Sequence, residues 1–260
     1  MSDGFLNDLF GMAGKTAVVI GGNGTLGAAL CRGLAGAGAN VVVAGRDMDR
    51  SRRVADELAT LGARAIAASV DVTERATIDA LLAAAIKEFG RVDALINCAG
   101  ANSATPYFDV PDEEWDRILA INLRATHWGC QIFGRHMVDA GGGAILNVAS
   151  VAAETPLSRV FAYSASKAGV VNLTRNLARE WATQGVRVNA LCPGFFPAEQ
   201  NRAILDETRV ADILRHTPMN RFGEPEELVG MALLLLAPKA GSFITGGTYY
   251  VDGGFMAMTI

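Results

Sequence analysis

The stretch TAVVIGGNGTLG, residues 16–27, decides how the chain folds. A short apolar run at 17–20 is followed by a turn with the spacing GxGxxG at Gly22, Gly24 and Gly27, and a run of helical period begins directly after it. Glycines let the backbone approach a pyrophosphate, and unpaired N–H groups at a helix start attract its charge. The stretch therefore predicts a strand, a turn and a helix that bind a dinucleotide. A turn that only packs the helix against the strand is the alternative.

The same unit repeats along the chain, which alternates short apolar runs with longer stretches of helical period. The runs are continuously apolar, as in parallel strands covered by helices on both faces. No change of composition marks a second domain, so we expect residues 1–260 to form one doubly wound α/β domain. A polar substrate loop at about 194–220 is inserted after the sixth strand, where the pattern loosens. The predicted strands are 17–20, 41–44, 65–69, 94–97, 144–149, 186–191 and 248–251, and the predicted helices are 26–37, 49–61, 74–89, 111–138, 161–183 and 225–236.

The composition of the chain indicates which class of ligand it binds. The chain has 23 basic and 27 acidic residues, for a formal net charge of −4, which argues against nucleic acid and anionic membranes and favours a small molecule. The longest apolar run, 228–237, is far shorter than the ~20 residues that span a bilayer, and residues 1–12 lack the pattern of a signal peptide. The spacing of the 4 cysteines fits neither a metal site nor a disulfide framework. We expect a cytoplasmic protein without a bound metal.

The end of the second predicted strand bears on the choice of cofactor. A carboxylate there binds the ribose 2′-hydroxyl of NAD, whereas an arginine accommodates the 2′-phosphate of NADP. The strand ends Ala44-Gly45-Arg46-Asp47, which places Arg46 next to the position of the acid and favours NADP(H). NAD(H) is the alternative, in which Asp47 binds the ribose. Asp71, just past the third strand, is a candidate acceptor for the adenine amino group.

The motif YSASK at 163–167 carries the chemistry. Its first and last residues, Tyr163 and Lys167, lie four positions apart and so share one face of a helix. An adjacent ammonium and an oxidised nicotinamide both favour the phenolate form of a tyrosine, which then exchanges a proton with an alcohol or carbonyl oxygen. The hydroxyl of Ser150, which follows the fifth strand, is positioned to bond the same oxygen. Asn122 by itself indicates only a helix interior.

With these motifs the chain resembles the short-chain dehydrogenase/reductase family over residues 14–254. The resemblance rests on the loop at 21–27, Asp71, the run NCAG at 97–100, Asn122, Ser150, Tyr163 with Lys167, the Pro-Gly pair at 193–194 and VDGG at 251–254. It implies a Rossmann fold with a mainly parallel seven-stranded sheet and a homotetramer or homodimer. It also implies that Tyr163 is the general acid/base, Ser150 orients the substrate oxygen, Lys167 binds the nicotinamide ribose and Asn122 holds a water of the proton relay. The implied cofactor-binding residues are Gly21, Asn23, Gly24, Thr25, Leu26, Gly27, Arg46, Asp71, Val72, Asn97, Ala99, Gly100, Tyr163, Lys167, Pro193, Gly194 and Phe196.

Three positions depart from the family pattern. Ile20 replaces the usual threonine before the loop, and Thr25 stands where the middle glycine normally lies. Ala198 replaces the threonine four residues after the Pro-Gly pair, so a hydroxyl expected near the nicotinamide carboxamide is missing. None of these changes affects Asn122, Ser150, Tyr163 or Lys167.

The segments 21–27, 193–202 and 216–223 resemble one branch, the D-mannonate oxidoreductases (fructuronate reductases) and gluconate 5-dehydrogenases. A sugar acid needs donors, acceptors and a carboxylate-binding fork. The candidates are Glu154, Arg159, Glu199, Gln200 and Arg202. The polar run at 199–202 has a second interpretation as the solvated start of a helix. The alternatives for the whole chain are a reductase of a less polar ketone and a catalytically silent protein that senses the cofactor.

Overall fold

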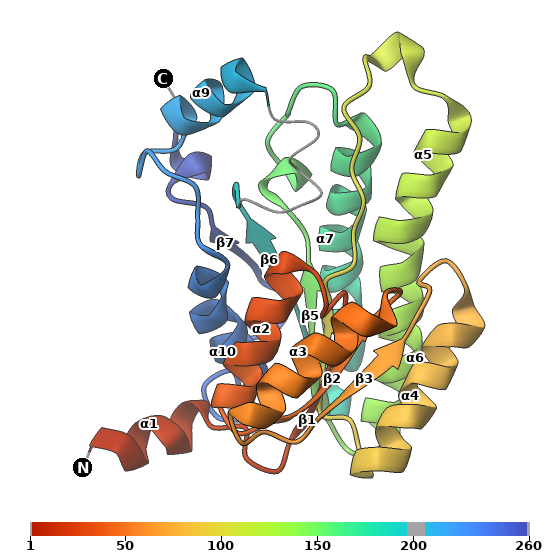
Figure 1. Ribbon diagram of the computed structural model, residues 1–260, viewed down its shortest axis with the longest axis vertical. Helices are drawn as coiled ribbons and strands as arrows, with labels where there is room; N and C mark the ends of the chain where they lie inside the picture. Colours follow the sequence, from red (N-terminus) through yellow and green to blue (C-terminus); the bar gives the residue numbers. More distant parts are fainter. Residues whose placement is uncertain (1, 197–205, 259–260) are drawn as a thin grey trace.

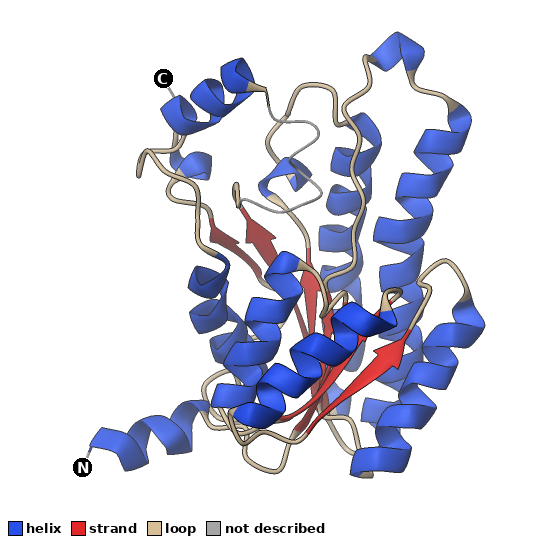
Figure 2. Cartoon of the chain, in the orientation of Figure 1, coloured by secondary structure: helices blue, strands red, loops and turns tan. Residues whose placement is uncertain are grey.

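A seven-stranded sheet with all strands parallel runs through the molecule, as Figures 1 and 2 show. The computed structural model describes residues 2–196 and 206–258. The strand order is β3-β2-β1-β4-β5-β6-β7, which confirms the predicted doubly wound fold and makes the sheet wholly rather than mainly parallel. The strands are β1 (Thr16–Ile20), β2 (Asn40–Gly45), β3 (Ala65–Ser69), β4 (Ala94–Asn97), β5 (Gly143–Val148), β6 (Val186–Pro193) and β7 (Thr248–Val251).

The helices cover both faces of this sheet. Between the strands lie α2 (Thr25–Gly36), α3 (Met48–Thr60), α4 (Arg75–Phe89), α5 (Asp112–Leu119), α6 (Ala125–Asp139), α7 (Phe161–Trp181), α9 (Glu207–His216) and α10 (Val229–Leu236), and α1 (Ser2–Phe10) precedes the first strand. Figure 1 shows α2, α3 and α10 in front of the sheet, with α4, α6 and α7 on its other side.

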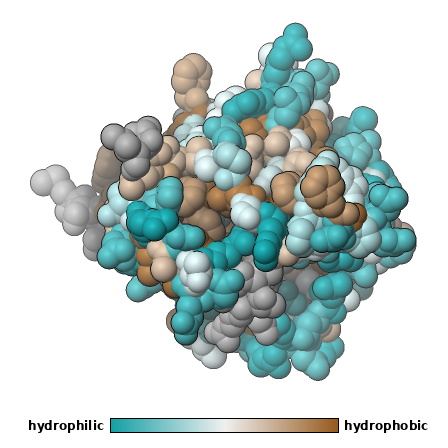
Figure 3. Space-filling model, turned by 90° about the horizontal axis from the view of Figure 1, so that it is seen from above, coloured by the Kyte–Doolittle hydropathy of each residue, from teal (hydrophilic) through white to brown (hydrophobic). Residues whose placement is uncertain are grey.

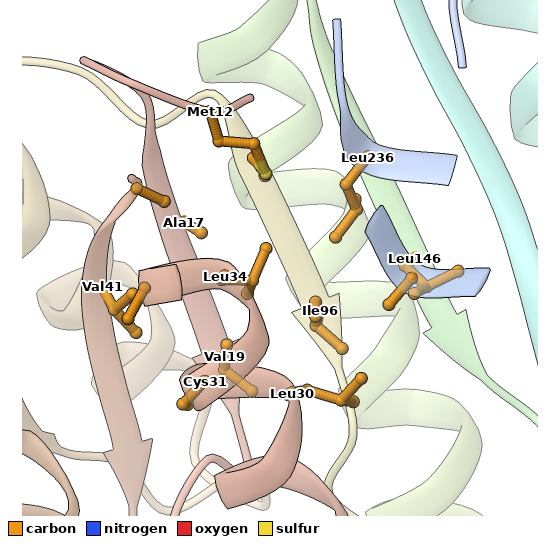
Figure 4. Close-up of a cluster of buried hydrophobic side chains, with 14 of the residues drawn as sticks. Met12, Ala17, Val19, Leu30, Cys31, Leu34, Val41, Ile96, Leu146 and Leu236 are labelled. Atoms are coloured by element: carbon orange, nitrogen blue, oxygen red, sulfur yellow. The ribbon is translucent and has the colours of Figure 1, made fainter. Parts of the chain in front are cut away.

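Two hydrophobic cores follow from the alternation of side chains along the strands. Val19 packs with Leu30 and Leu34 of α2, whereas its neighbour Val18 packs in the core that contains Phe133 of α6. Figure 4 shows the first of these cores, where side chains of α2 meet those of β1, β2, β4 and β5. Because both strand faces are buried, every position of β1 is apolar or fully covered, and this explains the continuous apolar runs.

The structure corrects the long helix predicted at 111–138. A π-helical turn at Ala120–Arg124 separates α5 from α6. A π-turn inserts one extra residue into a helix and often marks a functional position. Here it contains Asn122, whose side chain bonds the backbone of the loop after β4.

Two helices were not predicted. The polar stretch up to Asn220, predicted as a loop, contains α9, because Asp206 accepts a hydrogen bond from the backbone N–H of Arg209 at 2.7 Å and so starts a helix. At the other end of the chain, α1 is tied down by an ion pair between Asp8 and Lys239 and by a hydrogen bond of 3.1 Å from the Ala240 N–H to the Leu9 carbonyl.

The strand order places a crevice at one edge of the sheet. β1 lies between β2 and β4, so the connections that leave the carboxyl ends of β1 and β4 run to opposite sides. Ligands of open α/β sheets bind at such a switch point. Within residues 2–196 and 206–258 we find no helix with the length and apolar character needed to cross a membrane.

Candidate active site

An open cavity of about 470 Å³ lies at the carboxyl edge of the sheet. Figure 3 views the molecule from this side, where polar side chains surround a more apolar centre. The lining residues are Gly21, Asn23, Gly24, Thr25, Leu26, Gly27, Gly45, Arg46, Arg50, Val70, Asp71, Val72, Thr73, Cys98, Ala99, Gly100, Ala101, Arg117, Ile121, Val148, Ala149, Ser150, Tyr163, Lys167, Pro193, Gly194 and Phe196. We call the part that contains Arg46, Arg50 and Asp71 the arginine end, and the part that contains Ser150, Tyr163 and Lys167 the tyrosine end.

The glycine loop forms the floor between these two ends. Gly21 has a φ of 85°, and a Cβ at this position would lie 2.7 Å from the backbone nitrogen of Ala99. Only glycine fits there without moving the neighbouring strand end. The helix α2 starts from Gly24, which provides no side-chain cap, so the first N–H groups of the helix are left for an anion. The loop therefore fits a pyrophosphate group.

At the arginine end, the side chain of Asn23 occupies the space beside Gly45, the position of the expected acid. A Cβ on Gly45 would overlap the side-chain amide of Asn23, which donates hydrogen bonds to the Asp47 carbonyl at 2.9 Å and to Ser51 Oγ at 3.1 Å. The Asp47 carboxylate accepts a hydrogen bond of 3.0 Å from the N–H of Arg50, so it caps α3. The side chains of Arg46 and Arg50 are exposed and line the cavity.

Asp71 remains ionised at this end of the cavity. Its carboxylate accepts hydrogen bonds from the hydroxyl of Thr73 at 2.7 Å and from the Thr73 N–H at 2.9 Å. These bonds, and secondarily the nearby charge of Arg46, lower the pKa of Asp71. A free oxygen lone pair on this carboxylate is a suitable acceptor for an exocyclic amino group.

Tyr163 and Ser150 meet at the tyrosine end. Ser150 is only 7% exposed, accepts a hydrogen bond of 3.1 Å from the Ala152 N–H, and bonds the phenol oxygen of Tyr163. Burial raises the pKa of Tyr163, and the hydrogen bond with Ser150 offsets part of that rise. The sequence suggested that the neighbouring ammonium lowers this pKa. In the protein alone burial dominates, so the phenol stays protonated.

Lys167 is buried beside this tyrosine. Its ammonium donates a hydrogen bond of 2.8 Å to the Val148 carbonyl and lies 5.6 Å from the centroid of the Tyr163 ring. Burial lowers the pKa of Lys167 to about 8. The amine is therefore mostly protonated at neutral pH, with donors left over for a ligand in the cavity.

Asn122 lies behind the tyrosine end and is fully buried. Its amide group accepts from the Ala101 N–H at 2.8 Å and donates to the Ala101 carbonyl at 2.9 Å and to Ser166 Oγ at 3.0 Å. Ser166 in turn donates to the carbonyl of Tyr163 at 2.6 Å. The π-turn is thus connected to the start of α7 through a chain of short hydrogen bonds.

This geometry agrees with what the chain resembles among known proteins. A family model described as enoyl-(acyl carrier protein) reductase matches residues 22–256, from the glycine loop to beyond the last strand. The chain belongs to the short-chain dehydrogenase/reductase family. It is therefore an NAD(P)-dependent oxidoreductase that acts on CH–OH groups.

Relatives in this family match nearly the whole length of the chain. The 5-keto-D-gluconate 5-reductase of Escherichia coli is 34% identical, over 96% of this chain and 99% of the relative. The structure of a gluconate 5-dehydrogenase from Burkholderia cenocepacia in complex with NADP and tartrate superposes with a TM-score of 0.93 at 32% identity, and covers 97% of this chain and 99% of that one. A 7α-hydroxysteroid dehydrogenase with NADH and 7-oxo glycochenodeoxycholic acid has a TM-score of 0.91 at 32% identity, over 95% and 96% of the two chains.

The cavity brings together most of the residues that the family pattern pointed to. Of the predicted cofactor-binding residues, all except Asn97 line it. The side chain of Asn97 is turned into the sheet, where it donates to Asn147 Oδ1 at 2.8 Å. The catalytic candidates Ser150, Tyr163 and Lys167 line the cavity, and Asn122 supports them from behind.

None of the predicted substrate-binding residues is found in the cavity lining among the residues that the structure describes. Glu154 does not line the cavity and pairs with Arg175 at 3.6 Å. Arg159 is also absent from the lining and has an unusual φ of 66°. Glu199, Gln200 and Arg202, together with Ala198, lie outside the residues that the structure describes.

Several residues of the site were missed in the sequence. Ser166 stands inside the YSASK motif, but its role depends on the π-turn, which leaves no pattern in the sequence. Val148 contributes a carbonyl oxygen, which any residue type provides. Arg50 and Arg117 belong to no motif: Arg50 lies in the first turn of α3, and Arg117 lies on α5, one turn before Ile121.

Proposed function

We propose that this chain is an NADP(H)-preferring oxidoreductase that interconverts a hydroxyl and a ketone of a sugar acid or polyol, of the fructuronate/mannonate or ketogluconate type. One observation supports the proposal most directly. Tyr163, Ser150 and Lys167 line the same cavity as the glycine-rich loop. We expect the active form to be a homotetramer or homodimer in the cytoplasm.

The arginine end supports the preference for NADP(H). Gly45 carries no carboxylate at the position of the ribose-binding acid, and the Asp47 carboxylate caps α3. Arg46 and Arg50 supply planar cationic groups on the same rim, and guanidinium groups bind phosphate oxygens well. A 2′-phosphate therefore finds positive charge here, whereas a 2′-hydroxyl finds no carboxylate partner from Gly45 or Asp47.

The tyrosine end supplies the proton chemistry. In this proposal Tyr163 is the general acid/base and exchanges a proton with the substrate oxygen, while Ser150 orients that oxygen. Lys167 binds the nicotinamide ribose with the donors that its bond to Val148 leaves free. Asn122 fixes the π-turn, and in this proposal it also holds a water of the proton relay. When bound, the nicotinamide supplies the hydride acceptor or donor and, in its oxidised form, a positive charge that favours the phenolate.

The substrate class has separate support. Relatives that are 34–35% identical over 95–96% of this chain are a 5-keto-D-gluconate 5-reductase and a gluconate 5-dehydrogenase. The structural relative from Burkholderia cenocepacia holds tartrate, itself a hydroxy acid. These printed activities belong to the relatives, and they make polyhydroxy acids the first substrates to test.

The decisive experiment titrates the purified protein with NADPH and NADH and then follows nicotinamide absorbance with a panel of ketones. The panel contains keto sugar acids, neutral keto sugars and apolar ketones such as oxo-steroids. Turnover confined to the keto acids and keto sugars supports the proposal. Turnover only with apolar ketones contradicts the substrate class, and tight cofactor binding without any turnover indicates a sensing protein.

A further inference from the structure

A third arginine, Arg117, lines the cavity together with Arg46 and Arg50. Arg117 lies on α5, one helical turn before Ile121, and both residues line the cavity. Arg46 and Arg50, by contrast, follow β2 and begin α3. In Figure 1, α5 runs downward and continues directly into α6. Two separate elements therefore bring guanidinium groups to the same cavity.

Three apolar residues line the same cavity as Arg117. They are Val72, Ile121 and Ala99, which all pack in or against one hydrophobic core, and Ile121 lies one helical turn from Arg117. The Asp71 carboxylate also lines this cavity. Apolar walls with a single acceptor suit a flat heteroaromatic base, whereas a phosphate needs several donors. This part of the cavity fits a purine.

The side chain of Arg117 is also available to a ligand. It is exposed, and within residues 2–196 and 206–258 it has no hydrogen bond or ion pair. Acidic partners exist on its own helix at the usual spacing, but the carboxylate of Glu114 accepts from Thr105 Oγ1 at 2.8 Å instead. The guanidinium therefore keeps its planar face free for stacking.

We propose that Arg117 is a cofactor-binding residue whose guanidinium covers the adenine ring by a cation–π contact. This inference rests on the proposed cofactor function but is independent of the NADP preference, because NADP and NAD carry the same adenine. Arg46 and Arg50 act on the ribose phosphate, and Arg117 acts on the base. A planar guanidinium over an aromatic ring is the usual geometry of such contacts.

Binding measurements without turnover test this assignment. Dissociation constants for NADPH, NADH, 5′-AMP and reduced nicotinamide mononucleotide are measured on the full chain and on Arg117→Ala. The matched control is Arg53→Ala, an exposed arginine of α3 that does not line the cavity. We expect the Arg117 variant to raise the constants of NADPH, NADH and 5′-AMP alike, by about three- to tenfold, as a cation–π contact predicts. The mononucleotide and the control variant should show no change.

Three results would overturn the inference. Weaker binding of NADPH alone would assign Arg117 to the 2′-phosphate. Weaker binding of the nicotinamide mononucleotide would indicate a distorted cavity, and unchanged binding of all ligands would remove Arg117 from the site. Arg117→Gln, which keeps a flat polar group without charge, provides a second variant, and thermal unfolding verifies that both variants fold. The preference for NADP(H) is tested separately, with variants of Arg46. If that preference proves wrong, the binding constants of the Arg117 variants still test the adenine contact.

Discussion

At the tyrosine end of the cavity the polar groups are buried, whereas the arginines of the other end stand in solvent. Lys167 is 4% exposed and Ser150 is 7% exposed, and both are held by backbone partners. Arg46, Arg50 and Arg117 are exposed on the rim. Buried groups with fixed partners keep the geometry that proton transfer requires, and solvated charges provide affinity that is screened by salt. Substitutions at the tyrosine end should therefore change kcat and stability, whereas substitutions at the arginine end should cause smaller, salt-dependent changes in cofactor affinity.

The largest effect is expected at the tyrosine end. Tyr163→Phe removes only the hydroxyl that exchanges a proton, so kcat should fall by roughly 10²- to 10⁴-fold, the range for losing a general acid/base. The dissociation constant of NADPH should stay within about twofold of wild type, since a phenyl ring keeps the packing. Steady-state rates and a fluorescence titration measure the two quantities. Tyr107→Phe, at an exposed ring outside the cavity, is the control, and equal loss in both variants would contradict the assignment.

The next effect concerns stability and pH. Burial lowers the folded-state pKa of Lys167 from 10.5 to about 8. Between these pH values the unfolded state binds more protons than the folded state, so this lysine makes the protein more stable as the pH rises and less stable as it falls through about 8. The free energy of unfolding of wild type should gain up to about 3 kcal/mol relative to Lys167→Met across this window.

Urea unfolding at pH 7.5, 9 and 10 measures this difference. The control is Lys87→Met, at an exposed lysine of α4, for which the difference from wild type should stay constant. A constant difference for Lys167→Met as well would mean that the ammonium is not desolvated in the folded protein.

A smaller effect is expected at the arginine end. Arg46→Asp replaces the cation by a carboxylate beside the ribose, so NADPH should bind roughly tenfold more weakly while NADH is unaffected or improved. The loss should shrink in high salt, because exposed charges are screened. Titrations with both cofactors in low and high salt give the ratio, and Arg53→Asp corrects for the change in net charge. An unchanged ratio would refute the proposed preference for NADP(H).

The smallest effect is expected at Asp47, where a substitution shows whether the carboxylate only caps α3 or also binds the ribose. Asp47→Ala removes the cap of α3 and should cost about 1 kcal/mol of stability without changing the NADH dissociation constant. Asp49→Ala, in the first turn of the same helix, should cost less because Asp49 makes only an exposed pair with Arg52. Chemical denaturation and an NADH titration compare the two variants. If NADH binding weakened in Asp47→Ala, that carboxylate would bind the ribose after all.

Residues that act through local spacing were predictable from the sequence. The GxGxxG turn needs only its neighbours in the chain, and the pair Tyr163 and Lys167 needs only the helical period. The structure adds contacts between residues that are far apart. Asn122 bonds the loop at Ala101 and the helix at Ser166, and these contacts depend on an extra residue in the helix turn. Local propensity does not reveal such a turn, because it is stabilised by tertiary hydrogen bonds.

The amino-acid sequence by itself determined the parallel sheet, the glycine-rich turn and the helical pairing of Tyr163 with Lys167, because each follows from the periodicity and spacing of nearby residues. Only the tertiary structure decided the pKa shifts of the site residues and the space around them. Burial sets the pKa of Tyr163 and Lys167 in directions that the side chains alone do not show, and the side chain of Asn23 closes the space beside Gly45. Desolvation and close packing depend on which distant segments meet, and that is fixed only when the chain is folded.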